Sequence, residues 1–237
     1  MSDNVLLEID ENLEPIKNYG WTHNPLSHYN YTINEYRGDA HKKVLNYIFN
    51  DNDIKVIYDI GANSGATCDL FIYYSNKYKN KLEKIYLFEP DSDNYKFLQE
   101  NIKKHRKNLI SSFNKGIFYG KKVMDVYLPK MENNEIYFTT GGYCVNPDSL
   151  SKNMSKIDKT FELVELEELN LLKPDFIKMD IEGSEINLIK NSVLLKEAKY
   201  IYLEWSDKEP FHNVLKKYLV DYDIVFQSPD ILLKRKH

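Results

Sequence analysis

Residues 56–65 read Val-Ile-Tyr-Asp-Ile-Gly-Ala-Asn-Ser-Gly, an apolar, β-branched run that meets the acidic Asp59 and passes at once into a small-residue turn. This pattern predicts a buried parallel strand that enters a tight loop, with a helix beginning at about Ala66. Gly61 and Gly65 allow the backbone to approach a ligand closely. Small molecules bind at the carboxyl ends of strands in open α/β sheets. We therefore expect a ligand site at this turn.

Strands and helices are predicted to alternate along most of the chain, which indicates a parallel sheet covered by helices. The helices are expected at 39–49, 66–79, 91–104, 183–191 and 210–219. The strands are expected at 55–60, 84–89, 109–114, 122–128, 135–139, 175–179 and 199–204, with a closing hairpin of 223–227 and 231–236. One domain over 1–237 fits this order, with a Rossmann-like core at 39–237 and an irregular cap or lid at 1–38.

Composition narrows the class of protein. With 237 residues, 42% of them hydrophobic, the chain is long enough for one well-packed domain. Its net charge of −4 gives no general attraction to nucleic acid or to an anionic membrane. The cysteines Cys68 and Cys144 have no metal-like spacing, and no apolar run approaches the ~18 residues of a membrane span. We expect a cytoplasmic protein in a reducing compartment, with no membrane partner.

Acidic residues follow four of the predicted strands and should meet at one edge of the sheet. They are Asp59, Glu89, Asp180 and Glu204. Glu89 stands where a ribose-binding acid is expected, because a carboxylate can accept hydrogen bonds from both ribose hydroxyls. The glycines are spaced G-x-x-x-G and no Walker lysine follows, which argues against a dinucleotide fingerprint and a P-loop. A cationic sulfonium that bears an amino acid suits this acidic edge better than a pyrophosphate does.

Five motifs together resemble a known family. They are D-I-G-A-N-S-G at 59–65, F-E-P at 88–90, N-K-G-I at 114–117, F-I-K-M-D-I-E-G-S-E at 176–185 and Y-L-E at 202–204. Their types and order are similar to those of the FkbM family of S-adenosylmethionine-dependent class I methyltransferases. The resemblance spans roughly 39–205. It implies a Rossmann-like three-layer αβα sandwich with a mostly parallel, seven-stranded sheet and an antiparallel C-terminal strand.

The resemblance also implies which residues hold the cofactor. Its methionine part would be lined by Asp59, Gly61, Asn63 and Gly65, with Ala62 and Ser64 in the same loop. The ribose would be held by Glu89, which Pro90 follows, and the adenine would lie beside Asn114, Lys115 and Gly116. The methyl group and the acceptor would be faced by Asp180, Glu182 and Glu185.

Asp180 and Glu182 are the candidate catalytic residues. In methyl transfer to an alcohol, the nucleophile lies about 3 Å from the methyl carbon, and a carboxylate can take its proton. Two carboxylates this close together can raise one pKa toward neutrality. Asp180 could instead cap the helix predicted from about Glu182, and the positive end of that helix is the better explanation of Glu185. A divalent metal is not expected, although Asp180, Glu182 and Glu204 could hold Mg²⁺.

The acceptor class follows from the resemblance and from an acidic, hydrogen-bonding crevice that suits hydroxyls. We expect an O-methyltransferase that acts on a small polyhydroxylated acceptor, a sugar or nucleotide-sugar of a surface-polysaccharide or natural-product pathway. The candidate substrate residues are His23, His28, Tyr143 and Glu204. The alternatives are a methyltransferase that acts on RNA or protein and a non-catalytic cofactor-binding module. Nucleic acid is not expected as a partner, and a homodimer is left open.

Overall fold

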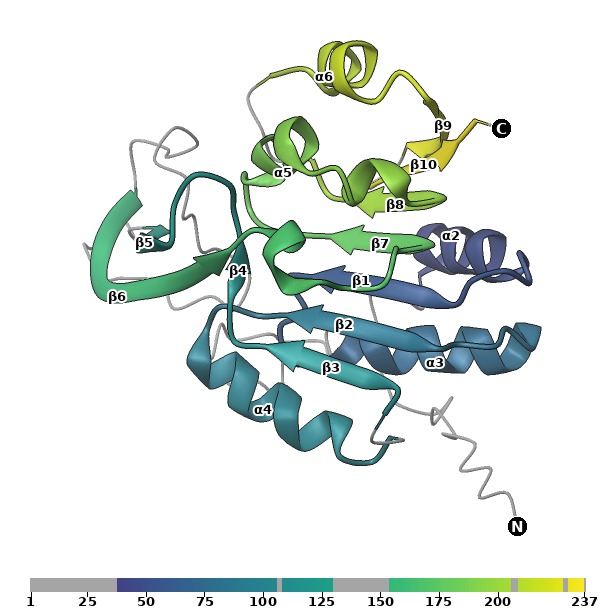
Figure 1. The fold of residues 1–237 in the computed structure, drawn as a ribbon, viewed down its shortest axis with the longest axis horizontal. Helices are drawn as coiled ribbons and strands as arrows, with labels where there is room; N and C mark the ends of the chain where they lie inside the picture. Colours follow the sequence, from purple (N-terminus) through teal and green to yellow (C-terminus); the bar gives the residue numbers. More distant parts are fainter. Residues whose placement is uncertain (1–37, 106–107, 130–153, 206–208, 228–229, 237) are drawn as a thin grey trace.

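A seven-stranded sheet forms the centre of the structure, with the strand order β3-β2-β1-β7-β8-β10-β9 (Figure 1). This computed structural model describes residues 38–105, 108–129, 154–205, 209–227 and 230–236. The strands of the sheet are β1 (Val56–Ile60), β2 (Lys84–Phe88), β3 (Ile110–Phe113), β7 (Phe176–Met179), β8 (Tyr200–Leu203), β9 (Tyr222–Gln227) and β10 (Ile231–Arg235). Pairs from β3 to β8 are parallel, whereas β10 is antiparallel to β8 and β9. The predicted sheet is confirmed.

Helices cover both faces of this sheet. They are α2 (Asp39–Phe49), α3 (Ala66–Tyr78), α4 (Ser92–Ile102), α5 (Glu185–Asn191) and α6 (Phe211–Tyr218), with short 3₁₀ turns at Leu166–Leu169 and Leu195–Glu197. α2, α3 and α4 share one hydrophobic core, and α5 and α6 share the other. On β7, Phe176 belongs to the first core while Ile177 and Met179 belong to the second. Because successive side chains point to opposite faces, both layers are built from the same apolar strands.

β1 lies in the middle of the sheet, between β2 and β7, and all of its residues are buried. Its apolar sequence suits a strand that is covered on both faces. Because β1, β2, β7 and β8 are parallel, the loops that follow them open at one edge, which we call the carboxyl edge. The opposite edge is called the amino edge. In Figure 1 the arrowheads of β1, β2, β3 and β7 all point toward the carboxyl edge, on the left.

A second, three-stranded sheet lies beside the carboxyl edge (Figure 1). Its order is β4-β6-β5, formed by β4 (Gly116–Ile117), β5 (Val123–Pro129) and β6 (Met154–Val164). A small core that includes Val126, Phe161 and Leu163 holds it together. The sequence predicted β5 within a residue or so but missed β4 and β6. β6 is polar and half-exposed over most of its length and is buried only from Phe161 onward, so it lacks the usual apolar pattern.

The other predicted elements are found with ends that shift by one or two residues. The strand expected at 135–139, the glycine-paired loop at 139–146 and the segment 1–37 lie outside the described residues. Within the described ranges, no helix is long and apolar enough to cross a membrane.

Candidate active site

The loop between β1 and α3, residues 61–65, has a backbone shape that few residue types allow. Gly61 and Gly65 have φ of +83° and +85°, and Asn63 has φ of +46°. A Cβ atom on Gly61 would lie 1.9 Å from the backbone oxygen of Asp180, so a side chain cannot fit there. The loop therefore lies directly against the backbone that follows β7.

Glu89, the first residue after β2, is buried, and backbone amides of two loops hold its carboxylate. Oε2 accepts a hydrogen bond from the Asn63 amide and Oε1 accepts one from the Asp91 amide, each at 2.8 Å. Burial raises the pKa of Glu89 to about 7, although these amides lower it. Each carboxylate oxygen can accept more than one hydrogen bond. Both oxygens thus keep capacity for further hydrogen bonds, and the expected contact with ribose hydroxyls stays a prediction.

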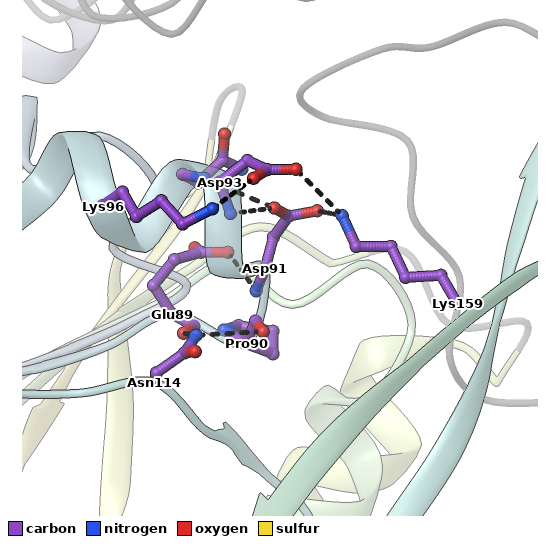
Figure 2. A network of polar contacts seen from close by, with 8 residues as sticks. Glu89, Pro90, Asp91, Asp93, Lys96, Asn114 and Lys159 are labelled. Carbon is purple, nitrogen blue, oxygen red and sulfur yellow. Dashed lines mark hydrogen bonds and ion pairs between the residues drawn. The ribbon is translucent and has the colours of Figure 1, made fainter.

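The residues around Glu89 join α4 to the second sheet, as Figure 2 shows. Asp91 is the N-cap of α4, and its Oδ1 accepts from the amides of Asp93 and Asn94 at 2.8 and 3.3 Å. Its other oxygen forms an ion pair with Lys159 of β6. The loop after β2 is thus tied to two elements at once.

Asn114, Lys115 and Gly116, the three residues expected beside an adenine, each make a different contact within the protein. Asn114 donates from Nδ2 to the carbonyls of Glu89 and Pro90 at 2.9 and 3.1 Å (Figure 2). Lys115 pairs with an exposed carboxylate of β6 at 2.7 Å. Gly116 begins β4, and a Cβ atom there would lie 3.4 Å from the Pro90 ring. Asn114 therefore shapes the loop that carries Glu89, and the contacts of all three with a cofactor stay a prediction.

Asp59 is fully buried within β1. Its carboxylate accepts a hydrogen bond from the Thr67 hydroxyl and lies 3.6 Å from the ammonium of Lys178. Burial raises the pKa of Asp59, and Lys178 and Thr67 partly offset that effect. These contacts stabilise the loop 61–65 from inside the protein. The expected contact of Asp59 with the methionine part of a cofactor stays a prediction.

Lys178 of β7 joins this buried acid to Asp180. Its Nζ donates to the Gly61 carbonyl at 3.0 Å and to Oδ2 of Asp180 at 3.2 Å. The side chain of Asp180 is 40% exposed, so this carboxylate remains accessible at the carboxyl edge. Lys178 was not among the predicted site residues. A lysine within an apolar strand was the available signal, because a buried lysine is rarely found without an anionic partner.

The turn between β7 and α5 adds further carboxylates. Glu182 has φ of +52°, in the left-handed region that non-glycine residues rarely adopt. Burial, together with the charges of Asp180, Glu204 and Glu185, raises the pKa of Glu182 to about 9. Glu182 is therefore protonated near neutral pH and can donate a hydrogen bond, whereas a carboxylate can only accept one.

α5 begins at Glu185, two residues later than expected, and its N-cap residue is Ser184. Asp180 therefore does not cap this helix. Glu185 is fully buried and accepts a hydrogen bond from the Ile181 amide at 3.2 Å. Burial raises its pKa to about 7.

The carboxyl edge thus gathers most of the predicted residues. The loop 61–65, Glu89, Asp180 and Glu182 lie there, and Glu204 follows β8 directly and contributes to the electrostatics of Glu182. The substrate candidates His23, His28 and Tyr143 lie outside the described residues.

The sheet order, the antiparallel strand beside β8, the glycine loop after β1 and the acid after β2 define a class I, Rossmann-like methyltransferase. Residues 59–226 match the model of the methyltransferase FkbM domain, which is most of the chain. The protein belongs to that family, whose members use S-adenosylmethionine as methyl donor.

Solved structures of methyltransferases are similar to this chain. Methyltransferase FkbM from Methylobacillus flagellatus KT is 18% identical, with a TM-score of 0.49 over 77% of this chain and 44% of that one. The chain thus spans less than half of that protein. A precorrin-6y C5,15-methyltransferase from Geobacter metallireducens GS-15 is 16% identical, with a TM-score of 0.44 over 83% and 88%. M. capricolum TrmK, in complex with S-adenosylhomocysteine, is 13% identical, with a TM-score of 0.44 over 82% and 69%. No match was found among curated proteins.

The residues at the carboxyl edge fit S-adenosylmethionine. Two backbone amides hold the Glu89 carboxylate beside the glycine loop, and Gly61 packs against the backbone that follows β7. Among the described residues, the carboxylates of Asp59 and Asp180 both lie close to the ammonium of Lys178, so negative charge is in excess there. A cationic sulfonium suits this excess of negative charge. Among the described residues, no group of three or more His, Cys, Asp or Glu side chains is arranged to hold a metal ion.

Proposed function

We propose that this methyltransferase acts on a hydroxyl of a small polyhydroxylated acceptor, a sugar or nucleotide-sugar. Bound S-adenosylmethionine supplies the methyl group. The observation that carries the proposal is Asp180: a carboxylate at the end of β7, anchored on its inner side by Lys178 and 40% exposed on the other. It stands beside the cofactor loop, because its backbone oxygen touches Gly61. This is where a general base for an alcohol is needed.

Asp180 and Glu182 would divide the proton chemistry between them. Asp180 accepts the proton of the acceptor hydroxyl as its oxygen attacks the methyl carbon. Glu182, whose pKa is raised to about 9 by burial and by its acidic neighbours, stays protonated and donates a hydrogen bond that orients the acceptor. Exposed Glu204 lies near enough to influence Glu182 and would bind another acceptor hydroxyl.

The test is a screen of acceptors that measures the release of S-adenosylhomocysteine. The panel contains neutral sugars, nucleotide-sugars, an RNA transcript and a peptide mixture, each with S-adenosylmethionine. Turnover on a sugar or nucleotide-sugar supports the proposal, and turnover only on RNA or peptide overturns it. Binding of S-adenosylhomocysteine with no turnover on any member would indicate a non-catalytic cofactor-binding module.

The role of Asp180 is tested with the acceptor that the screen finds. Asp180→Asn should lower kcat by about 10²- to 10⁴-fold, which is the usual contribution of a general base, and should leave S-adenosylhomocysteine binding nearly unchanged. Asp175→Asn is the matched control, because Asp175 lies directly before β7 at the amino edge and binds backbone amides there. Wild-type turnover in Asp180→Asn would remove Asp180 from the mechanism.

A further inference from the structure

One buried lysine lies between the two parts of the site, and in the function proposed above it serves only to anchor Asp180. Lys178 is paired in register with Asp59 of β1 and with Tyr202 of β8, and its side chain is 6% exposed. Desolvating an ammonium is costly, so its place in the central sheet requires compensation from its neighbours.

Lys178 has three oxygen neighbours, and each belongs to a different part of the site. The Gly61 carbonyl, at 3.0 Å, is the first carbonyl of the cofactor loop. Oδ2 of Asp180, at 3.2 Å, belongs to the proposed base. Oδ1 of Asp59, at 3.6 Å, belongs to the acid buried within β1. A single ammonium therefore fixes the loop and the carboxylate relative to each other.

We propose that Lys178 is a positioning residue that ties the cofactor loop to the Asp180 carboxylate, so that one ammonium both orders the loop and fixes that carboxylate beside it. The part that concerns Asp180 rests on the proposed function. The part that concerns the loop depends only on the binding of the cofactor.

The charges around Lys178 agree with this role. Burial lowers its pKa, but the carboxylates of Asp180, Asp59 and Asp230 outweigh burial and raise it, so the ammonium stays charged. Asp230, just before β10, is in turn 3.7 Å from His41 of α2. Burial lowers the pKa of His41, which favours the neutral ring. Tyr202, in register with Lys178, donates to Asp230 from β8. Lys178 therefore stays positively charged beside Asp180, whereas the nearby His41 ring is shifted toward its neutral form.

Removing this charge has two separate consequences. The Gly61 carbonyl loses its donor, so the loop is no longer held in the form that binds the cofactor. The Asp180 carboxylate loses the donor that fixes its position, so the proposed base is no longer held beside the loop. The first effect weakens binding of both S-adenosylmethionine and S-adenosylhomocysteine. The second effect lowers turnover without a further loss of cofactor binding.

The experiment is calorimetric titration of Lys178→Met with S-adenosylhomocysteine, followed by turnover of this variant with the acceptor that the screen finds. We expect S-adenosylhomocysteine to bind about 10-fold more weakly, which corresponds to about 1.4 kcal/mol. At saturating cofactor, kcat should also fall, because Asp180 is no longer held in place. Lys178→Arg, which keeps the charge and a donor, should recover part of both losses. A folded Lys178→Met protein with wild-type affinity and wild-type kcat would overturn the proposal.

Two controls separate positioning from stability. Lys199→Met removes an ion pair with Asp51, 2.6 Å long, at the amino edge of the same sheet, and should lower the melting temperature without changing either affinity. If Lys178→Met does not fold, Asp59→Asn combined with Lys178→Met removes both partners of the buried pair, and the same losses are expected in that protein. Unchanged binding and turnover there would overturn the proposal.

Asp180→Asn distinguishes the proposal from the proposed function. Turnover should fall in this variant, whereas binding of S-adenosylhomocysteine should persist because Lys178 still holds Gly61. Wild-type turnover would overturn Asp180 as the proposed base, and with it the part of the proposal that concerns Asp180. The tie to the loop is then decided by the S-adenosylhomocysteine affinity of Lys178→Met alone.

Discussion

The two edges of the central sheet use the same residue type in opposite ways. At the amino edge, Asp175 precedes β7, and its Oδ2 accepts hydrogen bonds from the amides of Lys55 and Val56, each at 2.8 Å. At the carboxyl edge, Asp180 follows β7, and its described donor is a lysine side chain that it shares with Asp59. The first carboxylate joins two strands. The second is held from one side and left accessible from the other, which is the arrangement that a reacting group needs.

Backbone strain shows the same contrast. Positive φ is found in the loops of the carboxyl edge at Gly61, Asn63, Gly65, Glu182 and Gly183. Glycine adopts this conformation without strain, so the strained residues are Asn63 and Glu182. On the other side, Lys79 and Asn170 have positive φ as the C-cap residues of a helix and of a 3₁₀ turn, where this conformation is ordinary. Strained backbone persists only where the surrounding structure enforces it, and it gathers at functional sites. Substitutions at matched positions can test whether strained and functional residues are confined to the carboxyl edge.

The largest expected effect concerns two glycines with nearly the same backbone angle. Gly61 and Gly120 have φ of +83° and +87°, but a Cβ atom on Gly61 would lie 1.9 Å from the Asp180 oxygen, while one on Gly120 would meet nothing within 4 Å. Gly61→Ala should lower the free energy of unfolding by about 3 kcal/mol or more, and Gly120→Ala by about 1 kcal/mol from φ alone. Urea denaturation measures both. Equal losses would mean that the contact with Asp180 does not constrain the loop.

A smaller effect is expected for two glutamates at opposite ends of β2. Glu89→Gln removes the charge from a carboxylate that two amides orient. We expect S-adenosylhomocysteine to bind about 100-fold more weakly, since hydrogen bonds to a charged group contribute about 1.5–3 kcal/mol each. Wild-type affinity should also fall as the pH drops below about 7, where Glu89 becomes protonated, and the variant should lack this dependence.

Glu83→Gln is the control for this titration. Glu83 precedes β2 at the amino edge, its side chain is 56% exposed, and it pairs with Lys55 at 3.5 Å. Calorimetry should give the wild-type dissociation constant and the wild-type pH dependence. If Glu83→Gln and Glu89→Gln weaken binding equally, the loss does not come from hydrogen bonds between the ribose hydroxyls and the Glu89 carboxylate at the carboxyl edge.

The sequence predicted the main sheet well because its strands are short, apolar and separated by helices with clear periodicity. Asp59, Glu89 and Asp180 were predicted as site residues because each lies at or next to the carboxyl end of such a strand. Their partners were not predicted. The contacts that Lys178 makes with Gly61 and Asp59 join residues more than a hundred positions apart, and only the parallel register brings them together. Polar β6 was missed for a similar reason, since its pattern gave no sign of the small core that it joins.

The smallest expected effect is a change in how stability depends on pH. The pKa of Glu182 rises from 4.5 to about 9 on folding, because burial and nearby carboxylates disfavour its charged form. The folded protein therefore binds this proton more tightly than the unfolded chain, so stability falls as the pH rises between these two values. One proton can contribute at most about 1.4 kcal/mol per pH unit, and solvent at the site keeps the slope below that.

Glu182→Gln should flatten the curve of unfolding free energy measured by urea at about pH 6, 7 and 8. Glu162→Gln, which changes an exposed carboxylate on β6, should leave the slope unchanged. Parallel curves for Glu182→Gln and the wild type would show that Glu182 is already ionised, and it could then no longer donate the hydrogen bond that distinguishes its role from that of Asp180.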